Sequence, residues 1–177
     1  VKMKGKFIFL IHGVTGAGKS TVAKKVGSAI ERTATFDMDD VKWQISDFNK
    51  VKVDNYLISN IFFKMVEVYC ENGINCIVPQ ALVPGDYERY EVITKKNNYK
   101  LYVVDLFGEE STLIERVKKR QRESNSPSPS PTERILKNIE YYKNTDLNIF
   151  FENRIDTTYL AQKELESLLI DLLDLRE

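Results

Sequence analysis

Nine consecutive residues near the start of the chain have the types and spacing of a loop that holds phosphate groups. They are Gly13-Val14-Thr15-Gly16-Ala17-Gly18-Lys19-Ser20-Thr21, which fit the pattern GxxxxGK[ST]. The glycines permit backbone angles closed to other residues, and successive N–H groups can then form an anion-binding nest. A helix that starts near Gly18 would add the positive end of its dipole. We expect all nine residues to contact a nucleotide, with Lys19 at the β- and γ-phosphates and the Ser20 hydroxyl on Mg²⁺.

The surroundings of this phosphate loop (residues 13–21) support that interpretation. The apolar run Phe7–Ile11 precedes it and is typical of a strand buried on both faces, and residues 19–31 have the pattern of a helix. His12 lies at the junction of strand and loop. For His12 we favour a packed neutral imidazole over a catalytic role.

A second group of chemically capable residues follows the next short strand. The segment is Phe36-Asp37-Met38-Asp39-Asp40. Ligands of open α/β sheets bind beyond the carboxyl ends of the strands, so these acids belong near the phosphate loop if the two strands are adjacent. One carboxylate could hold Mg²⁺ and another could accept a proton from an attacking hydroxyl. The alternative is helix capping, with Asp39 or Asp40 as the N-cap of a helix from Val41; we favour capping for Asp40 and chemistry for Asp39.

The elements that must position these residues alternate between short apolar runs and helices. Further strands are expected at 35–36, 76–78 and 101–104, with a fifth at either 147–151 or 154–156. Further helices are expected at 41–72, 86–97 and 112–123, then from about residue 132, and finally at 161–175. The segment 124–131, rich in Ser and Pro, predicts a loop. This order predicts an α/β fold: three α/β/α layers around a five-stranded parallel sheet, in one domain over 1–177.

Bulk properties exclude several classes of protein. The chain has 177 residues and equal numbers of basic and acidic side chains, 26 of each, so its net charge gives no support to a nucleic-acid or membrane-surface role. Its apolar runs are far too short to cross a bilayer, and no targeting segment is visible. Cys70 and Cys76 lack metal or redox spacing, and we expect reduced thiols in a cytoplasmic protein.

Together, the phosphate loop and the Asp37-Met38-Asp39 motif resemble the small P-loop kinases. These include shikimate kinase, gluconate kinase, chloramphenicol phosphotransferase and the polynucleotide 5′-kinase domain. The resemblance covers nearly the whole chain in order and implies ATP and Mg²⁺ as cofactors. It further implies that Asp39 contacts the acceptor hydroxyl as the catalytic acid–base group and that Asp37 tunes the metal shell.

The segment Leu113 to Arg122 looks like the helix that leads into the lid of such kinases, here about 116–132. In similar kinases the earlier arginine packs on adenine, which indicates Arg116, and later ones close on the phosphates, which indicates Arg120 and Arg122. An arginine can spread over the charge of a phosphoryl transition state, so Arg120 is a catalytic candidate. The alternative is a solvated basic helix face.

The third strand departs from the family pattern. Many P-loop enzymes have an aspartate at its end, where this chain has Gln80. Gln80 could bind the acceptor, and Asp105 could supply the missing charge from the fourth strand. Arg89 resembles an arginine that binds acidic acceptors in similar sequences, although a surface role is equally compatible.

We therefore expect a kinase that transfers phosphate from ATP to a small-molecule hydroxyl, bound between the phosphate loop and the 41–72 helices. Nucleoside monophosphate kinase and polynucleotide 5′-kinase activity remain as alternatives, with nucleic acid the less favoured partner. A regulatory nucleotide-binding ATPase is the alternative from another class.

Overall fold

The computed structural model describes residues 5–48, 52–124, 131–147, 149, 151 and 153–174. Its strands are β1 (Phe7–Gly13), β2 (Thr33–Thr35), β3 (Asn75–Pro79), β4 (Lys100–Phe107) and β5 (Asn153–Asp156). Its helices are α1 (Lys19–Ala29), α2 (Met38–Lys42), α3 (Lys52–Glu71), α4 (Asp86–Asn97), α5 (Glu110–Ser124), α6 (Pro131–Asn144) and α7 (Gln162–Asp174). Among the residues described, no helix is long and apolar enough to span a membrane.

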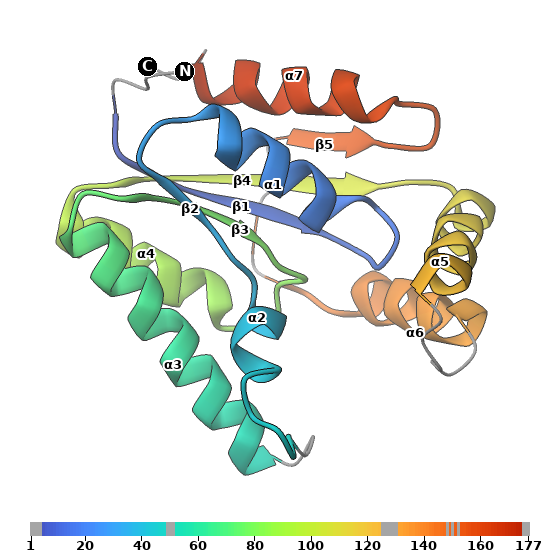
Figure 1. Cartoon of the computed structure of the whole chain (residues 1–177), viewed down its shortest axis with the longest axis horizontal. Helices are drawn as coiled ribbons and strands as arrows, with labels where there is room; N and C mark the ends of the chain where they lie inside the picture. The colour runs from blue at the N-terminus through green and yellow to red at the C-terminus, as the bar shows by residue number, and fades with distance from the viewer. Residues whose placement is uncertain are drawn as a thin grey trace.

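The five strands form one parallel sheet in the order β2-β3-β1-β4-β5. Helices α1 and α7 cover one face, and α3 and α4 cover the other (Figure 1). The predicted three-layer α/β/α fold with a five-stranded parallel sheet is therefore confirmed. The strand arrows in Figure 1 point toward α5 and α6, so these two helices lie beyond the carboxyl ends of the strands.

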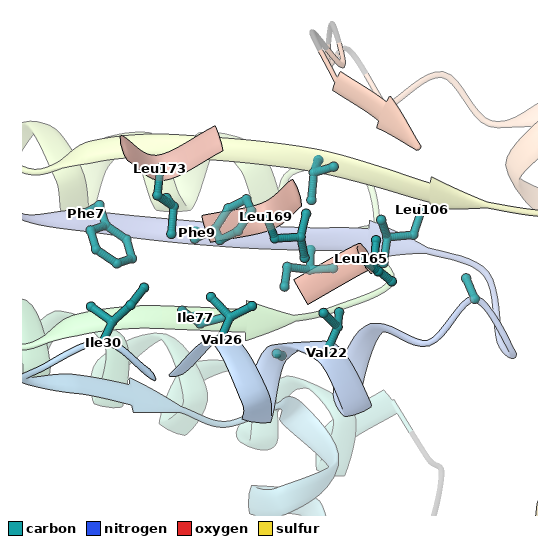
Figure 2. Packing of buried hydrophobic residues seen from close by; sticks show 14 of the residues in the cluster. Phe7, Phe9, Val22, Val26, Ile30, Ile77, Leu106, Leu165, Leu169 and Leu173 are labelled. Atoms are coloured by element: carbon teal, nitrogen blue, oxygen red, sulfur yellow. The ribbon is translucent and has the colours of Figure 1, made fainter. Parts of the chain in front are cut away.

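The alternation of side chains along β1 explains why the sheet is buried on both faces. Phe7 and Phe9 point into a core shared with α1 and α7, where Val26 and Leu169 meet them (Figure 2). Ile8 and Leu10 belong to a second core under α3 and α4. Because successive side chains of a strand point to opposite faces, His12 continues the second row and lies on the α3/α4 side.

Several predicted elements need correction at their ends. The region 41–72 contains two helices, and α2 begins at Met38 because Asp37 is able to cap it. Strand β2 begins and ends earlier than expected. The fifth strand is the later alternative, within 153–156, while Leu147 and Ile149 pack against the second core. Helix α4 has the bounds predicted for it, with Asp86 in its first turn and Lys96 in its last, as the helix dipole favours.

Of the predicted Ser-Pro loop, residues 125–130 lie outside the described part of the chain, and Pro131 already belongs to α6.

Cys70 and Cys76 are buried free thiols, as the spacing predicted.

Candidate active site

The phosphate loop has a backbone that its glycines alone permit. Gly13, Gly16 and Gly18 have φ angles of 143°, 93° and 94°. A Cβ atom on Gly13 would lie 2.2 Å from the Leu106 carbonyl oxygen, and one on Gly16 would lie 2.9 Å from the carbonyl oxygen of Leu113. The loop is therefore folded tightly against β4 and α5. Because glycine has no side chain, the main chain is uncovered at these positions.

The start of α1 favours an anion. Gly18 is the N-cap and supplies no side-chain hydrogen bond, and the first turn contains no acidic residue. The positive end of the helix dipole is thus not neutralised by the helix itself. Lys19 Nζ donates a 3.0 Å hydrogen bond to the Val14 carbonyl oxygen, which folds the lysine back over the loop. Ser20, next along α1, is exposed and can present its hydroxyl to a metal ion.

The acidic segment after β2 is organised as a helix start. Asp37 Oδ1 accepts hydrogen bonds from the Asp39 and Asp40 N–H groups at 2.8 and 3.1 Å, and Asp40 Oδ2 accepts from the Asp37 N–H at 2.8 Å. This is a capping box with Asp37 as the N-cap of α2. The expectation that Asp39 or Asp40 is the N-cap was wrong by two or three residues. Burial, together with the charges of Asp40 and Asp39, raises the pKa of Asp37.

Asp39 has a different environment from its neighbours. Its carboxylate is exposed and accepts a 2.6 Å bond from Lys42 Nζ, one turn along α2. Strand β3 lies between β2 and β1, so the condition of adjacent strands fails. The acids and the phosphate loop nevertheless follow parallel strands of one sheet, and so belong to the same edge.

Arg116 is held by the turn that follows β5. Its guanidinium donates to the Thr157 Oγ1 and carbonyl oxygen at 3.1 and 2.6 Å, and to the Thr158 carbonyl oxygen at 3.5 Å. Arg120 and Arg122, by contrast, are exposed on α5. Sequence reasoning did not single out the Thr157–Thr158 turn, although its position after a parallel strand is a usual ligand position.

Gln80 belongs to a buried network. Its Nε2 donates to Asp86 Oδ2 at 2.6 Å, and its Oε1 accepts from the Tyr90 hydroxyl at 2.5 Å. Both ends of the amide are therefore engaged by α4. Desolvation raises the pKa of Asp86.

Arg89 packs between α3 and α4. Its guanidinium donates to Ser59 Oγ at 2.6 Å and to Asn60 Oδ1 at 3.3 Å, and it lies 3.7 Å from the ring centroid of Phe63. This arrangement joins the two helices. It leaves Arg89 less available for an acceptor than the sequence suggested.

His12 is a packed neutral histidine, as expected. It is 4% exposed, and its Nδ1 accepts a 3.0 Å hydrogen bond from the Leu82 N–H. Desolvation lowers the pKa of His12 to about 4, against an opposing effect of Asp105. Asp105 Oδ2 in turn accepts a 2.9 Å bond from Arg154 Nε, so its charge is already paired.

No group of three or more candidate metal ligands (His, Cys, Asp or Glu) occurs within the described ranges. The residues present suit a more weakly held Mg²⁺, which usually keeps several waters and takes one or two protein oxygens besides substrate phosphates. Ser20 and Asp37 are of the right chemical type.

Comparison with known proteins places the chain in a family. Residues 8–145 match the family model described as AAA domain, and the chain belongs to that family of P-loop proteins. No curated protein matches it.

Solved structures of two small kinases and of an antibiotic resistance protein share the fold. A gluconokinase from Sinorhizobium meliloti 1021 is 15% identical, with a TM-score of 0.60 over 98% of this chain and 93% of that one. The Mycobacterium tuberculosis APS kinase is 14% identical, with a TM-score of 0.66 over 96% and 98%. A Deinococcus radiodurans tunicamycin resistance protein is 14% identical, with a TM-score of 0.65 over 95% of each chain. At these identities the likeness concerns the fold.

Proposed function

We propose that this protein is an ATP-dependent phosphotransferase that acts on a small-molecule hydroxyl. The observation that carries the proposal is the phosphate loop. It is a cradle of three glycines at positive φ, closed by Lys19 at the start of α1, where no side chain caps the helix. Such a cradle binds the phosphates of a nucleotide through backbone N–H groups and a helix dipole. The similarity to small kinases supports transfer to an acceptor over hydrolysis.

The nucleotide base belongs beside Arg116 in this proposal. The guanidinium is fixed by three contacts to the turn 157–158, so its plane is pre-organised for stacking. Arg120 lies one helical turn beyond Arg116 on α5 and is exposed. In this proposal it contacts the phosphates of the nucleotide whose base lies beside Arg116. It would stabilise the charge that spreads over the phosphoryl group during transfer.

Mg²⁺, when bound, would neutralise charge on the β- and γ-phosphates. Ser20 and Asp37 are the residues proposed to hold it. Asp37 Oδ1 is used by the capping box, and its Oδ2 has no hydrogen bond to any described residue, so one oxygen remains for the ion or its waters. A nearby cation would also stabilise the charged form of a carboxylate whose pKa is otherwise raised by burial.

Asp39 is the proposed proton acceptor. In the transfer step, the acceptor oxygen forms a bond to the γ-phosphorus, the bond from that phosphorus to the bridging oxygen of ADP breaks, and the hydroxyl proton passes to the Asp39 carboxylate. Lys42 bonds this carboxylate at 2.6 Å, so the lysine is able to orient it. The exposure of Asp39 suits a group that must meet a diffusing acceptor.

The engagement of Gln80 weighs against a regulatory ATPase. Such a protein usually relies on a polar or acidic group after the third strand to position metal or water, and here Asp86 and Tyr90 occupy both ends of the amide. Arg89 is similarly committed to Ser59 and Asn60, which weakens the case for a phosphorylated or polynucleotide acceptor.

A thermal-shift measurement tests the nucleotide half of the proposal. Mg²⁺ with the ATP analogue AMPPNP should raise the melting temperature, because a ligand that binds only the folded state stabilises it by mass action. Lys19→Ala should lose most of this shift and remain folded. Lys24→Ala, on an exposed position of the same helix, is the matched control and should keep it. Equal shifts in all three proteins would remove the phosphate-loop assignment.

A further inference from the structure

A cavity of about 550 Å³ lies beside the phosphate loop, at the ends of β1 and β4. The strand ends, α5, α6 and the segment after α6 line it. Val14, whose carbonyl oxygen accepts the bond from Lys19, is one of its lining residues. The cavity therefore adjoins the end of the loop where the terminal phosphates of a nucleotide would lie. Its volume is in the range of sites that take small molecules.

The polar floor of this cavity has one hydrogen-bond donor and one acceptor side by side. The Nδ1 of His12 accepts a bond from Leu82, so the proton of this neutral ring is on Nε2. Nε2 lies 3.9 Å from Asp105 Oδ1, too far for a direct hydrogen bond, and makes no other polar contact with described residues. His12 is nine-tenths buried, so its remaining N–H can be satisfied only through the cavity.

A hydroxyl group fits this gap. A hydroxyl can accept a hydrogen bond from Nε2–H and donate one to Asp105 Oδ1, because it has both a donor and acceptor lone pairs. A carboxylate or a fully ionised phosphate has no proton to donate, and either anion would meet the negative charge of Asp105. The floor therefore selects for an uncharged hydroxyl-bearing group.

Aromatic rings form the adjoining wall. Phe151 stacks on the His12 ring at 5.1 Å and 21°, and Tyr142 meets it edge-on at 5.0 Å and 84°. Both side chains line the cavity, as do Leu113 and Ile139. Such a surface suits one face of a ring with apolar C–H or π character.

The side chains that line the cavity have no excess of positive charge. Two basic residues line it, Arg154 and Lys143, against three acidic ones, Asp105, Glu110 and Asp146. Arg154 is already bonded to Asp105 at 2.9 Å, and His12 contributes no charge. A site for a phosphorylated or carboxylated ligand would normally present an excess of basic groups.

We propose that this cavity binds the acceptor of the kinase, and that the acceptor is an uncharged ring compound with hydroxyl groups, such as a nucleoside or a neutral sugar. This inference rests on the proposed phosphotransferase function. One hydroxyl of the ligand bridges His12 and Asp105, and its ring lies against Tyr142. The rest of the ligand extends past Val14 toward the terminal phosphates. Because Asp39 does not line the cavity, the hydroxyl that Asp39 would deprotonate belongs to that far end of the ligand.

Calorimetric titration in saturating AMPPNP and Mg²⁺ tests the inference. The probes are neutral nucleosides and neutral sugars, in separate arms, each paired with its anionic counterpart: uridine with uridine monophosphate, and glucose with glucuronate. We expect at least one neutral probe to bind at least tenfold more tightly than its anionic counterpart. The arm that contains it identifies the kind of ring.

Two matched pairs of variants locate the binding site. Ile139→Trp fills the cavity and should weaken binding of the neutral probe more than tenfold, whereas Leu136→Trp, exposed on the same helix, should not. Asp105→Asn keeps the shape of the side chain and removes its charge. It should weaken binding of the neutral probe and reduce the ratio of the affinities for the neutral and the anionic probe. Tyr141→Phe, exposed beside the cavity residue Tyr142, should change neither.

Binding of AMPPNP distinguishes failure of the cavity assignment from failure of the proposed function. If AMPPNP binds and no neutral probe does, or if Ile139→Trp binds the probe as tightly as the unmodified chain, the cavity assignment is overturned and the phosphotransferase proposal stands. The same holds if the anionic probes bind more tightly. If AMPPNP itself fails to bind, the proposed function fails first.

Discussion

The Thr15 hydroxyl donates a 2.9 Å hydrogen bond to Asn138 Oδ1, which ties the phosphate loop to α6 across 123 positions of sequence. This bond joins the phosphate loop to the helix that lines the proposed acceptor cavity. The same helix places Tyr142 against His12, the residue before the loop. The phosphate loop and the proposed acceptor cavity are thus connected through α6.

We expect Asn138→Ala to lower the free energy of unfolding by about 1 kcal/mol, the usual net value of one hydrogen bond between neutral side chains. Chemical denaturation measures it. Asn144→Ala, at the exposed end of the same helix, is the control and should change it by less than about 0.5 kcal/mol. Equal losses in both variants would mean that the bond to Thr15 contributes nothing.

Gly13→Ala should be strongly destabilising. The new methyl group would lie 2.2 Å from the Leu106 carbonyl oxygen at a φ of +143°, so both a clash and backbone strain result. We expect a loss of about 2–5 kcal/mol, measured as a shift of the denaturation midpoint. Gly5→Ala, with no atom within 4 Å of the added methyl, should be nearly neutral. An unchanged midpoint for Gly13→Ala would contradict the described course of the loop.

The order of elements could be predicted because glycine, proline and apolar runs are local signals. Helix α4 is an example, since Gly85 and the charges of its two end turns mark its limits. The fifth strand was ambiguous because an apolar run also suits a segment that covers a core, as Leu147 and Ile149 do. The cap of α2 was misplaced, although Asp37 and Asp40 have the i, i+3 spacing of a capping box.

The candidate site was predictable only where its residues are consecutive. The phosphate loop is one continuous motif, whereas the role of Arg116 beside the base came from a resemblance and stays a prediction. The cavity depends on Asp105 and Arg154 lying next to His12, and this requires the order β1-β4-β5, which no local pattern contains. The partners of Gln80 likewise come from a helix that starts after it.

His12 should stay neutral well below its usual titration range. Its pKa in the folded state is lowered from 6.5 to about 4, so between these values the unfolded chain binds a proton that the folded chain does not. Stability therefore falls as the pH drops from about 6.5 to about 4, by up to roughly 3 kcal/mol from this group.

The measurement is an NMR titration of the imidazole, which is unambiguous because the chain has a single histidine. We expect a midpoint near pH 4 in buffer and near 6.5 in denaturing urea. A midpoint near 6.5 in the native protein would show that His12 is solvated, and the described packing of Phe151 on it would be wrong.

Asp39→Asn should bind AMPPNP almost normally and lose roughly 10²–10⁴-fold in kcat, the usual contribution of a general base. Asp40→Asn, at the second side chain of the capping box, should cost far less, since an amide oxygen can still accept from the Asp37 N–H. Steady-state kinetics on the folded variants provide the comparison. Full activity in Asp39→Asn with loss in Asp40→Asn would move the proton acceptor by one residue.

Transfer of labelled phosphate is a direct test of the proposed phosphotransferase activity. The protein is incubated with Mg²⁺ and ATP labelled on its γ-phosphate, with and without the neutral nucleosides and sugars, and the products are separated. We predict a labelled organic product that forms only when its acceptor is present and disappears in Lys19→Ala. Release of the label solely as inorganic phosphate, at a rate that no acceptor changes, would contradict the account and indicate a nucleotide-hydrolysing protein.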